Sequence, residues 1–103
     1  MAQKVRVLWT RVALRHLSEA RNFITIDSPA AANRQIQRIE HCVNRLRTFP
    51  MMGRKGIRPG TREFAVPATP YLLVYRFRED DLQILAVLHG ARNWKRESRS
   101  QEE

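Results

Sequence analysis

The chain has 103 residues, enough for one domain with a two-layer core and too few for a second. Its 19 lysines and arginines outweigh 10 acidic residues, and the net charge of +9 predicts an anionic partner: nucleic acid, nucleoprotein or an acidic protein. The single cysteine, Cys42, excludes an intramolecular disulfide and a zinc site built from several thiolates, and no run of about 18 apolar residues predicts a membrane span. We therefore expect a cytoplasmic protein that does not enter a membrane.

The first strand is predicted at residues 5 to 9, VRVLW, where apolar side chains recur at every second position. Thr10 follows as the expected N-cap of a helix over about residues 12 to 25. The apolar residues of this helix are spaced four, three and four apart, as on one helical face, and they are Ala13, Leu17, Ala20 and Ile24.

A second helix is predicted over residues 29 to 48. Asp27-Ser28-Pro29 supplies a cap and then a proline, which suits the first helical turn because proline has no N–H to leave unpaired. The apolar stripe of this helix has the same kind of spacing and consists of Ala32, Ile36, Ile39, Val43 and Leu46. We expect the two helices to close on each other as a hairpin, with Cys42 as a small packing residue beside the stripe.

Residues 51 to 60, MMGRKGIRPG, are rich in glycine and arginine and predict a loop. Three further strands are predicted at residues 61 to 66, 71 to 77 and 82 to 88, and REDD at residues 78 to 81 joins the last two as a hairpin. The order β-α-α-β-β-β predicts an α+β fold in which a helical hairpin packs on a small, mainly antiparallel sheet. We expect residues 1–96 to form one domain and residues 97–103 a flexible polar tail.

Two basic clusters are candidate sites. The first consists of Arg54, Lys55, Arg58 and Arg62; the second consists of His89, Arg92, Lys95 and Arg96, with Trp94 among them. Guanidinium groups bind phosphate, an indole can stack on a base and a histidine can exchange protons, so these residues suit either RNA cleavage or docking to a partner. A packed tryptophan with solvated arginines is the third interpretation.

Cofactors and metals are not expected. The histidines His16, His41 and His89 are far apart in the sequence and have no acidic or thiolate set beside them, and we expect His16 and His41 to pack at the surface or boundary of their helices. GRKG lacks the spacing and the following helix of a phosphate-binding loop. The charged clusters are therefore the places where a partner would bind.

Four segments in order, FPMMGRKG, PGTREFAV, PYLLVYRF and VLHGARNW, together with DSPAAA at the start of the second helix, closely resemble the ParE/RelE superfamily of toxins. The resemblance covers residues 5 to about 96. It implies a RelE/ParE-like fold and a small basic toxin of a bacterial type II toxin–antitoxin module. It also implies neutralisation by a cognate antitoxin, whose C-terminal segment wraps over the helical pair and the sheet in a toxin–antitoxin hetero-oligomer.

The superfamily implies two different targets. RelE-like toxins cut mRNA in the ribosomal A site, whereas ParE-like toxins inhibit DNA gyrase, cause growth arrest and have no nuclease activity. RelE-like nucleases carry cations at the positions that here appear to be Glu63, Ala65 and Leu72, and of the nuclease-type cations only Arg92 is matched. Glu63 would repel an RNA phosphate. The resemblance therefore favours the ParE-like, plasmid-stabilisation group, an inhibitor and not an enzyme.

The residues expected to contact the target are Arg58, Arg62, His89, Arg92 and Trp94. The alternative is a ribosome-dependent mRNA endoribonuclease in which Arg92, His89, Arg62 and Arg58 would take the catalytic roles, and in which Arg58, Arg62 and His89 could approach one cleft. A second alternative is a non-toxic basic module that binds nucleic acid. The partners implied are a cognate antitoxin and DNA gyrase, or the ribosome with mRNA.

Overall fold

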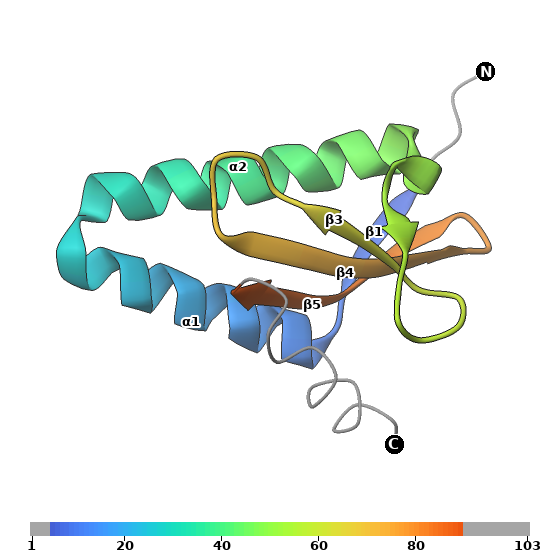
Figure 1. The fold of residues 1–103 in the computed structure, drawn as a ribbon, viewed down its shortest axis with the longest axis horizontal. Coiled ribbons are helices and arrows are strands. Elements are labelled where there is room, and N and C mark those ends of the chain that lie inside the picture. The colour runs from blue at the N-terminus through green and yellow to red at the C-terminus, as the bar shows by residue number, and fades with distance from the viewer. Residues whose placement is uncertain (1–4, 90–103) are drawn as a thin grey trace.

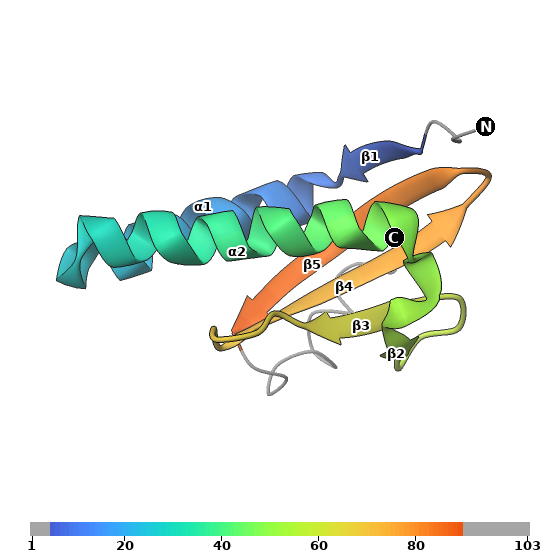
Figure 2. The ribbon, with the colours of Figure 1, turned by 90° about the horizontal axis from the view of Figure 1, so that it is seen from above.

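The computed structural model describes residues 5–89 of the chain. Its elements are β1 (Arg6–Trp9), α1 (Arg11–Asp27), α2 (Pro29–Thr48), a 3-10 turn η1 (Pro50–Met52), β2 (Arg54–Lys55), β3 (Arg62–Ala65), β4 (Tyr71–Arg78) and β5 (Asp81–His89). The strands form one sheet in the order β1-β5-β4-β3-β2, in which β1 and β5 are parallel and the other pairs are antiparallel. The helices cover one face of this sheet (Figures 1 and 2), which confirms the predicted α+β fold.

The predicted helices are found with small differences at their ends. The Thr10 hydroxyl accepts a hydrogen bond from the N–H of Ala13 at 3.0 Å, so Thr10 is the expected N-cap, and α1 continues to Asp27. Ser28 is the residue that caps α2, because its hydroxyl accepts from the N–H of Ala31 at 3.1 Å. In the described part of the chain, neither helix is long and apolar enough to cross a membrane.

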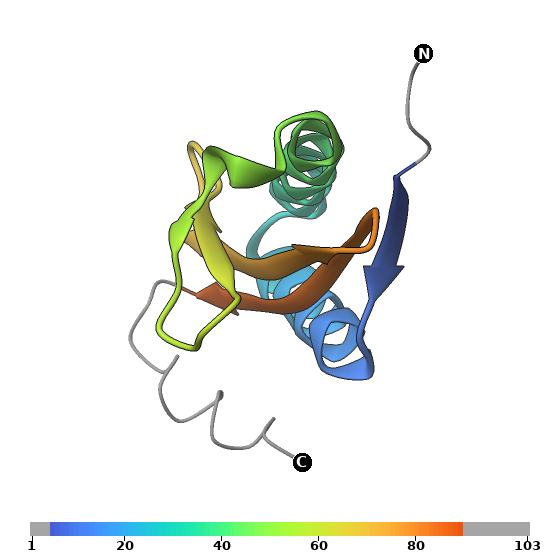
Figure 3. The same cartoon turned by 90° about the vertical axis from the view of Figure 1, so that its right-hand side faces the viewer.

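The predicted loop at residues 51 to 60 contains structure that the sequence did not indicate. A 3-10 turn, η1, directly follows α2, and the two residues of β2 then pair with Arg62 and Glu63 of β3 (Figure 3). A strand of two residues has no periodicity to detect. Both of its side chains, Arg54 and Lys55, are charged and exposed, which suits a strand at the edge of a sheet.

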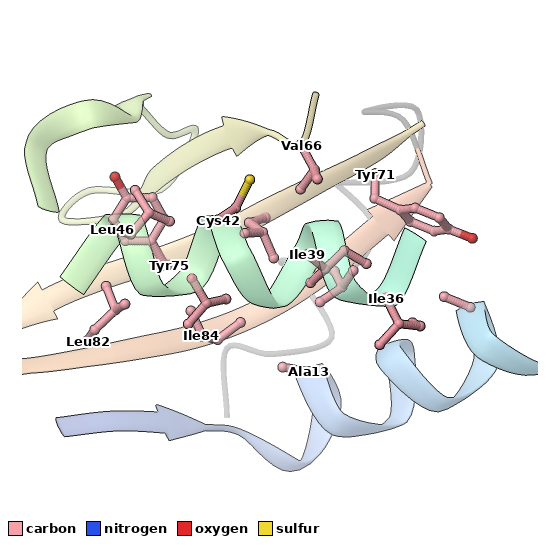
Figure 4. Close-up of a cluster of buried hydrophobic side chains, with 14 of the residues drawn as sticks. Ala13, Ile36, Ile39, Cys42, Leu46, Val66, Tyr71, Tyr75, Leu82 and Ile84 are labelled. Atoms are coloured by element: carbon pink, nitrogen blue, oxygen red, sulfur yellow. The ribbon is translucent and has the colours of Figure 1, made fainter. Parts of the chain in front are cut away.

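The main core lies between the helices and the sheet (Figure 4). The α2 stripe is buried as predicted, and so is Cys42. From the sheet, alternate residues of β4 and β5 point into this core, including Leu73, Tyr75, Leu82 and Ile84, which have no exposed surface. Burying each such side chain stabilises the fold by about 1.5–3 kcal/mol.

β4 and β5 are joined by a two-residue turn in which Glu79 and Asp80 have φ angles of 54° and 64°. Positive φ at both central residues is the pattern of a type I′ turn, whose twist matches that of the flanking strands. Further along, Tyr75 pairs with Ile84 but Val74 pairs with Ala86, so one extra residue of β5 bulges between them.

Candidate functional site

The loop between β2 and β3 has a defined shape because of its own hydrogen bonds. The N–H of Gly56 donates to the carbonyl of Thr61 at 2.8 Å, and the N–H and hydroxyl of Thr61 donate to the carbonyl of Arg58 at 3.2 and 2.7 Å. Gly60 has a φ of 82°, a left-handed conformation that glycine adopts without a steric penalty. Residues 56–61 therefore form a compact turn.

A hollow of about 390 Å³, here called the loop pocket, lies against this turn. Its cations come from successive parts of the chain: Lys55 from β2, Arg58 from the loop and Arg62 from β3. Met51 and Phe77 are its large apolar lining residues, and among the described residues no acidic side chain lines it. The structure thus brings the predicted site residues Arg58 and Arg62 to one place.

Glu63 is buried, at 5% exposure, on the face of β3 opposite to Arg62. Its carboxylate accepts a hydrogen bond from Nη2 of Arg54 at 3.2 Å and another from the N–H of Ile57 at 3.4 Å. Glu63 is therefore not an open negative charge facing a target. Its charge is used to attach β2 and the start of the loop to β3.

On the face of the sheet that is turned toward the helices, Tyr75 attaches the segment before β2 to the core. The Tyr75 hydroxyl donates to the carbonyl of Pro50 at 2.7 Å and accepts from the N–H of Gly53 at 2.9 Å. Nη1 of Arg62 donates to the carbonyl of Gly53 at 2.7 Å, which fixes the position of that guanidinium. Burial raises the pKa of Tyr75, while its bond from Gly53 and the nearby Arg62 lower it by less. The neutral phenol is thus the favoured form.

His89 lies elsewhere. It pairs with Tyr71 at one end of β4, whereas Arg62 pairs with Tyr75, four residues further along. Because β3 and β5 flank β4, the two positions are separated by about 13 Å along the strands and about 10 Å across them. The exposed His89 ring makes edge contacts with Tyr71 and with Phe23 of α1. A common cleft for Arg58, Arg62 and His89 is therefore not found; Arg92 and Trp94 lie outside the described residues.

Part of the sheet face turned away from the helices is apolar. Glu63 pairs with Val74 and Ala65 pairs with Leu72, and Leu72 in turn pairs with Leu88 of β5. Val74 and Leu88 belong to a second, smaller buried cluster on this face. The three positions that resemble the cation positions of the nucleases, Glu63, Ala65 and Leu72, are thus neighbours in space, and none of them carries a positive charge.

A second hollow, here called the helix groove, lies between α2 and the end of β3 and has a volume of about 440 Å³. Arg34, Arg38 and Arg45 line it from α2, and Phe64 and Pro67 line it from the sheet side. The sequence interpretation did not single out these arginines. Their spacing of four and seven places them on one helical face, beside the buried stripe, and this pattern was the available signal.

His16 is buried in the apolar stripe of α1, at 8% exposure, so the expectation that it packs at the surface or boundary is wrong. Its Nδ1 accepts a hydrogen bond from the N–H of Val87 at 3.2 Å, which satisfies a backbone group of β5. His16 therefore has a structural position. Among residues 5–89, no group of three His, Cys, Asp or Glu side chains could hold a metal ion.

Comparisons with known proteins find a matching family model and similar toxins. Residues 7–94 match the family model described as ParE toxin of type II toxin–antitoxin system, parDE. The chain is 39% identical over 89 residues to Y4kP of Sinorhizobium fredii, a protein whose name places it among toxins; the match covers 86% of this chain and 92% of that protein. It is 31% identical over 87 residues to Toxin RelE2 of Caulobacter vibrioides, covering 84% of this chain and 97% of that toxin.

Among solved structures, the fold is similar to that of a chain from the chromosomal ParDE toxin–antitoxin system of P. aeruginosa. The TM-score is 0.74 at 24% sequence identity, and the match covers 84% of this chain and 96% of that chain. At this identity the likeness concerns the fold: two helices on a five-stranded, mostly antiparallel sheet.

Proposed function

The chain belongs to the ParE toxin family of type II toxin–antitoxin systems, and from this membership we propose that it inhibits DNA gyrase and is neutralised by a cognate antitoxin. On this proposal the toxin acts by binding and not by catalysis. It stalls gyrase after the DNA has been cut, and the DNA breaks that result arrest growth. Its site of action is the cytoplasm, where gyrase and DNA are present.

The observation that carries the proposal is the chemistry of the sheet face opposite the helices. Cleavage of RNA needs cations for the phosphorane charge and groups that can exchange protons, and these must meet at one place. On this face, Arg54 is bound to Glu63 at 3.2 Å and Nε of Arg76 donates to the Gln83 amide oxygen at 2.6 Å. Arg6 is paired with Asp81 on the same face, and the positions around Ala65 and Leu72 are next to an apolar cluster of Val74, Ala86 and Leu88. This arrangement supports a binding toxin over a nuclease.

We propose that the contacts to gyrase are made by Arg58 and Arg62 of the loop pocket, together with His89, Arg92 and Trp94. The first two are close together, whereas His89 is at the other end of the sheet face that carries Tyr71 and Tyr75. A large protein target can contact both places at once, which a small catalytic cleft cannot. The separation of these residues is therefore compatible with recognition of an extended surface.

The helix groove is the proposed docking site of the antitoxin. It combines an apolar wall, Phe64 and Pro67, with three arginines, so it suits an amphipathic segment that carries acidic side chains. One chain of similar fold comes from a ParDE toxin–antitoxin system. Phe64 and Arg62 are two residues apart on β3, about 7 Å, so a segment in the groove would also lie beside the loop pocket.

The test is the supercoiling reaction of purified gyrase. The protein is expected to inhibit supercoiling and to increase the amount of cleaved DNA trapped with gyrase, and a variant with Arg58→Gln and Arg62→Gln is expected to need a higher concentration. A variant with Arg11→Gln and Arg15→Gln, which removes the same charge from the exposed side of α1, is the control. If supercoiling is unaffected and no cleaved DNA accumulates, gyrase is not the target.

A ribosome-dependent mRNA endoribonuclease is the second candidate, favoured by the 31% identity to Toxin RelE2 over 97% of that protein. It predicts discrete cuts in mRNA when the protein is added to translating ribosomes, and loss of those cuts on Arg92→Ala. Intact mRNA at high protein concentration would exclude this candidate.

A third candidate is a non-toxic module that binds nucleic acid. Growth arrest on expression, relieved by a small acidic protein encoded next to the gene, would favour a toxin of either kind over this module.

A further inference from the structure

One side of α2 carries a line of basic side chains along the helix groove, here called the basic row: Arg34, Arg38, His41 and Arg45. Their spacing of four, three and four places them within about 60° of one another around the helix axis. All four are exposed, and among residues 5–89 no ion pair involves any of them. The row is therefore a continuous stripe of hydrogen-bond donors and positive charge that the described chain does not neutralise.

The acidic residue of α2, Glu40, does not face this row. It lies two residues after Arg38 and five before Arg45, and residues at these spacings point to different sides of a helix. No acidic side chain of the described residues lines the groove either. Arg34 and Arg38 are four residues apart, where like charges repel each other and weaken a helix. The row thus costs the isolated helix stability and gains from a partner that brings carboxylates.

The groove beside the row is lined by apolar side chains. Cys42 lines it from α2 at 5% exposure, and Pro67 lines it as an exposed residue after β3. Phe64, the phenyl ring of the lining, packs against the main core, so its ring is not open for a base to stack on. A phosphate chain would gain nothing from these surfaces. A protein segment with one acidic side and one apolar side fits both the row and the groove.

The spacing of the row selects the conformation of that segment. Along α2 the row advances by about 6, 4.5 and 6 Å, because each helical residue rises by about 1.5 Å. A partner helix laid along α2 has the same rise, so acidic residues at the same spacing face every member of the row. In an extended segment the side chains of one face recur about every 6.8 Å, and by the fourth of them the mismatch has grown to about 4 Å. The row therefore favours a helix.

We propose that the basic row binds an acidic α-helix of the antitoxin, whose carboxylates recur at positions i, i+4, i+7 and i+11 and whose apolar flank lies toward Phe64 and Pro67. The arginines pair with carboxylates, and His41 donates a hydrogen bond from its ring. The spacing reads the same in both directions, so it holds for a parallel or an antiparallel helix. This deepens the proposed function and rests on it for the source of the helix.

The probe is a fluorescein-labelled peptide of eighteen residues, the matched peptide, with four glutamates at the spacing of the row in a background of alanine, glutamine and leucine. The scattered peptide has the same composition, with a glutamate at every fifth residue, which spreads the charges around the helix. The matched peptide should bind about tenfold more tightly in fluorescence anisotropy, because only its carboxylates meet the row together. Equal binding of the two, or no binding of the matched peptide, overturns the proposal. Circular dichroism compares their helix contents.

A third peptide tests the helical conformation. It keeps the glutamates of the matched peptide and has proline at two background positions between them, which prevents a helix. Its charge is unchanged, but its carboxylates can no longer follow the rise of α2. We expect it to bind about tenfold more weakly than the matched peptide. Binding as tight as that of the matched peptide would mean that the row accepts an extended segment, and would overturn the proposal.

The row is tested from the side of the protein by removing two of its charges. The variant with Arg34→Gln and Arg38→Gln should bind the matched peptide about tenfold more weakly. The control with Arg11→Gln and Arg15→Gln has the same net charge, altered on exposed positions of α1, and should stay within about threefold of the unmodified protein. Equal weakening of both variants would show that only the general positive charge matters, against the proposal. Circular dichroism checks that each variant is folded.

A reversal of charge tests the register. Arg38→Glu should weaken binding of the matched peptide, since a carboxylate would then face another carboxylate. In two further peptides one of the two central glutamates is replaced by arginine. One of these two should bind the Arg38→Glu variant about tenfold more tightly than the matched peptide does, and which one does so gives the direction of the helix. If neither regains affinity, residue 38 does not face the row of the peptide and the proposal fails.

The remaining outcomes identify the ligand and separate the row from the proposed function. An oligonucleotide of twelve thymidines should displace the matched peptide only at a much higher concentration; equal displacement would assign the row to nucleic acid instead. If the matched peptide binds as predicted but gyrase supercoiling is unaffected, the row assignment stands and gyrase as the target does not. If an antitoxin relieves growth arrest but the matched and scattered peptides bind alike, neutralisation stands and the row assignment does not.

Discussion

Nδ1 of His16, on α1, accepts a hydrogen bond from the backbone N–H of Val87, on β5, at a distance of 3.2 Å. This bond continues a series along one edge of β5. Strand β1 pairs with β5 only as far as Ile84, the N–H of Thr10 donates to the Ile84 carbonyl at 3.1 Å, and the Thr10 hydroxyl donates to the Leu85 carbonyl at 3.1 Å. A strand, a helix cap and a histidine thus satisfy successive backbone groups of the same edge.

We therefore predict that His16→Leu destabilises the protein although it places an apolar residue in an apolar stripe. The Val87 N–H would be left buried without an acceptor, which costs about 1–3 kcal/mol. His41→Leu, at an exposed position of α2, should change the free energy of unfolding by no more than about 0.5 kcal/mol. Urea denaturation measures both; an equal effect of the two substitutions would show that the hydrogen bond to Val87 contributes nothing.

His16 also shows where prediction from the sequence stops. The apolar residues at helical spacing indicated both helices and their buried faces, and alternation together with turn residues indicated the hairpin of β4 and β5, because these signals are local. The role of His16 depends on the bulge of β5 beside Val74 and on where α1 lies against that strand. The bulge and the position of α1 against β5 arise only when the chain folds. The sequence therefore offered no basis for pairing His16 with the N–H of Val87.

Glu63→Ala is predicted to loosen the β2–β3 loop. The substitution leaves the Ile57 N–H and the Arg54 guanidinium without the carboxylate that they share. Since the Arg54 side chain is 71% exposed and can return to water, we expect a modest loss of about 1–2 kcal/mol in the free energy of unfolding. Trypsin should also cut after Lys55, which precedes Gly56, faster than in the unmodified protein. A digestion pattern that matches the exposed control Glu40→Ala would refute this role for Glu63.

The sequence predicted which basic residues belong to the candidate site, but it predicted only part of their arrangement in space. Glycine and arginine in residues 51–60 indicated a basic loop, and Arg58 and Arg62 do line one pocket. The sequence did not show that Glu63 is an internal anchor, because Arg54 and Ile57 reach it across a turn. The distance between Arg62 and His89 was equally hidden, since it follows from their pairing with different ends of β4.

Gly53→Ala is predicted to disturb the attachment of η1 to the core. A Cβ at Gly53 would lie 2.5 Å from the Tyr75 hydroxyl oxygen and 2.8 Å from the Glu63 carbonyl oxygen, both closer than real contacts allow. We expect a loss of about 1–3 kcal/mol. In a Tyr75→Phe background the nearest of these contacts is gone, so the same substitution should cost less. Equal costs in the two backgrounds, measured by urea denaturation, would mean that the hydroxyl does not restrict residue 53.

Tyr75→Phe is predicted to lower stability near neutral pH and to flatten the loss of stability in alkali. Without the hydroxyl, the Pro50 carbonyl and the Gly53 N–H lose their partner, which costs about 1–3 kcal/mol. Burial raises the pKa of the phenol in the folded state above its ordinary value of about 10. Below that value both states hold the proton, and stability does not depend on this group.

As the pH rises above about 10, the unfolded chain releases the Tyr75 proton first, so it binds fewer protons than the folded chain and the free energy of unfolding falls. The contribution of one such group is at most about 1.4 kcal/mol per pH unit. Burial also raises the pKa of Cys42, so the comparison is best made in a Cys42→Ala background. Chemical denaturation between pH 8 and pH 11 should then give a steeper decline for the protein that keeps Tyr75 than for the Tyr75→Phe variant; parallel curves would show that the buried phenol does not titrate with unfolding.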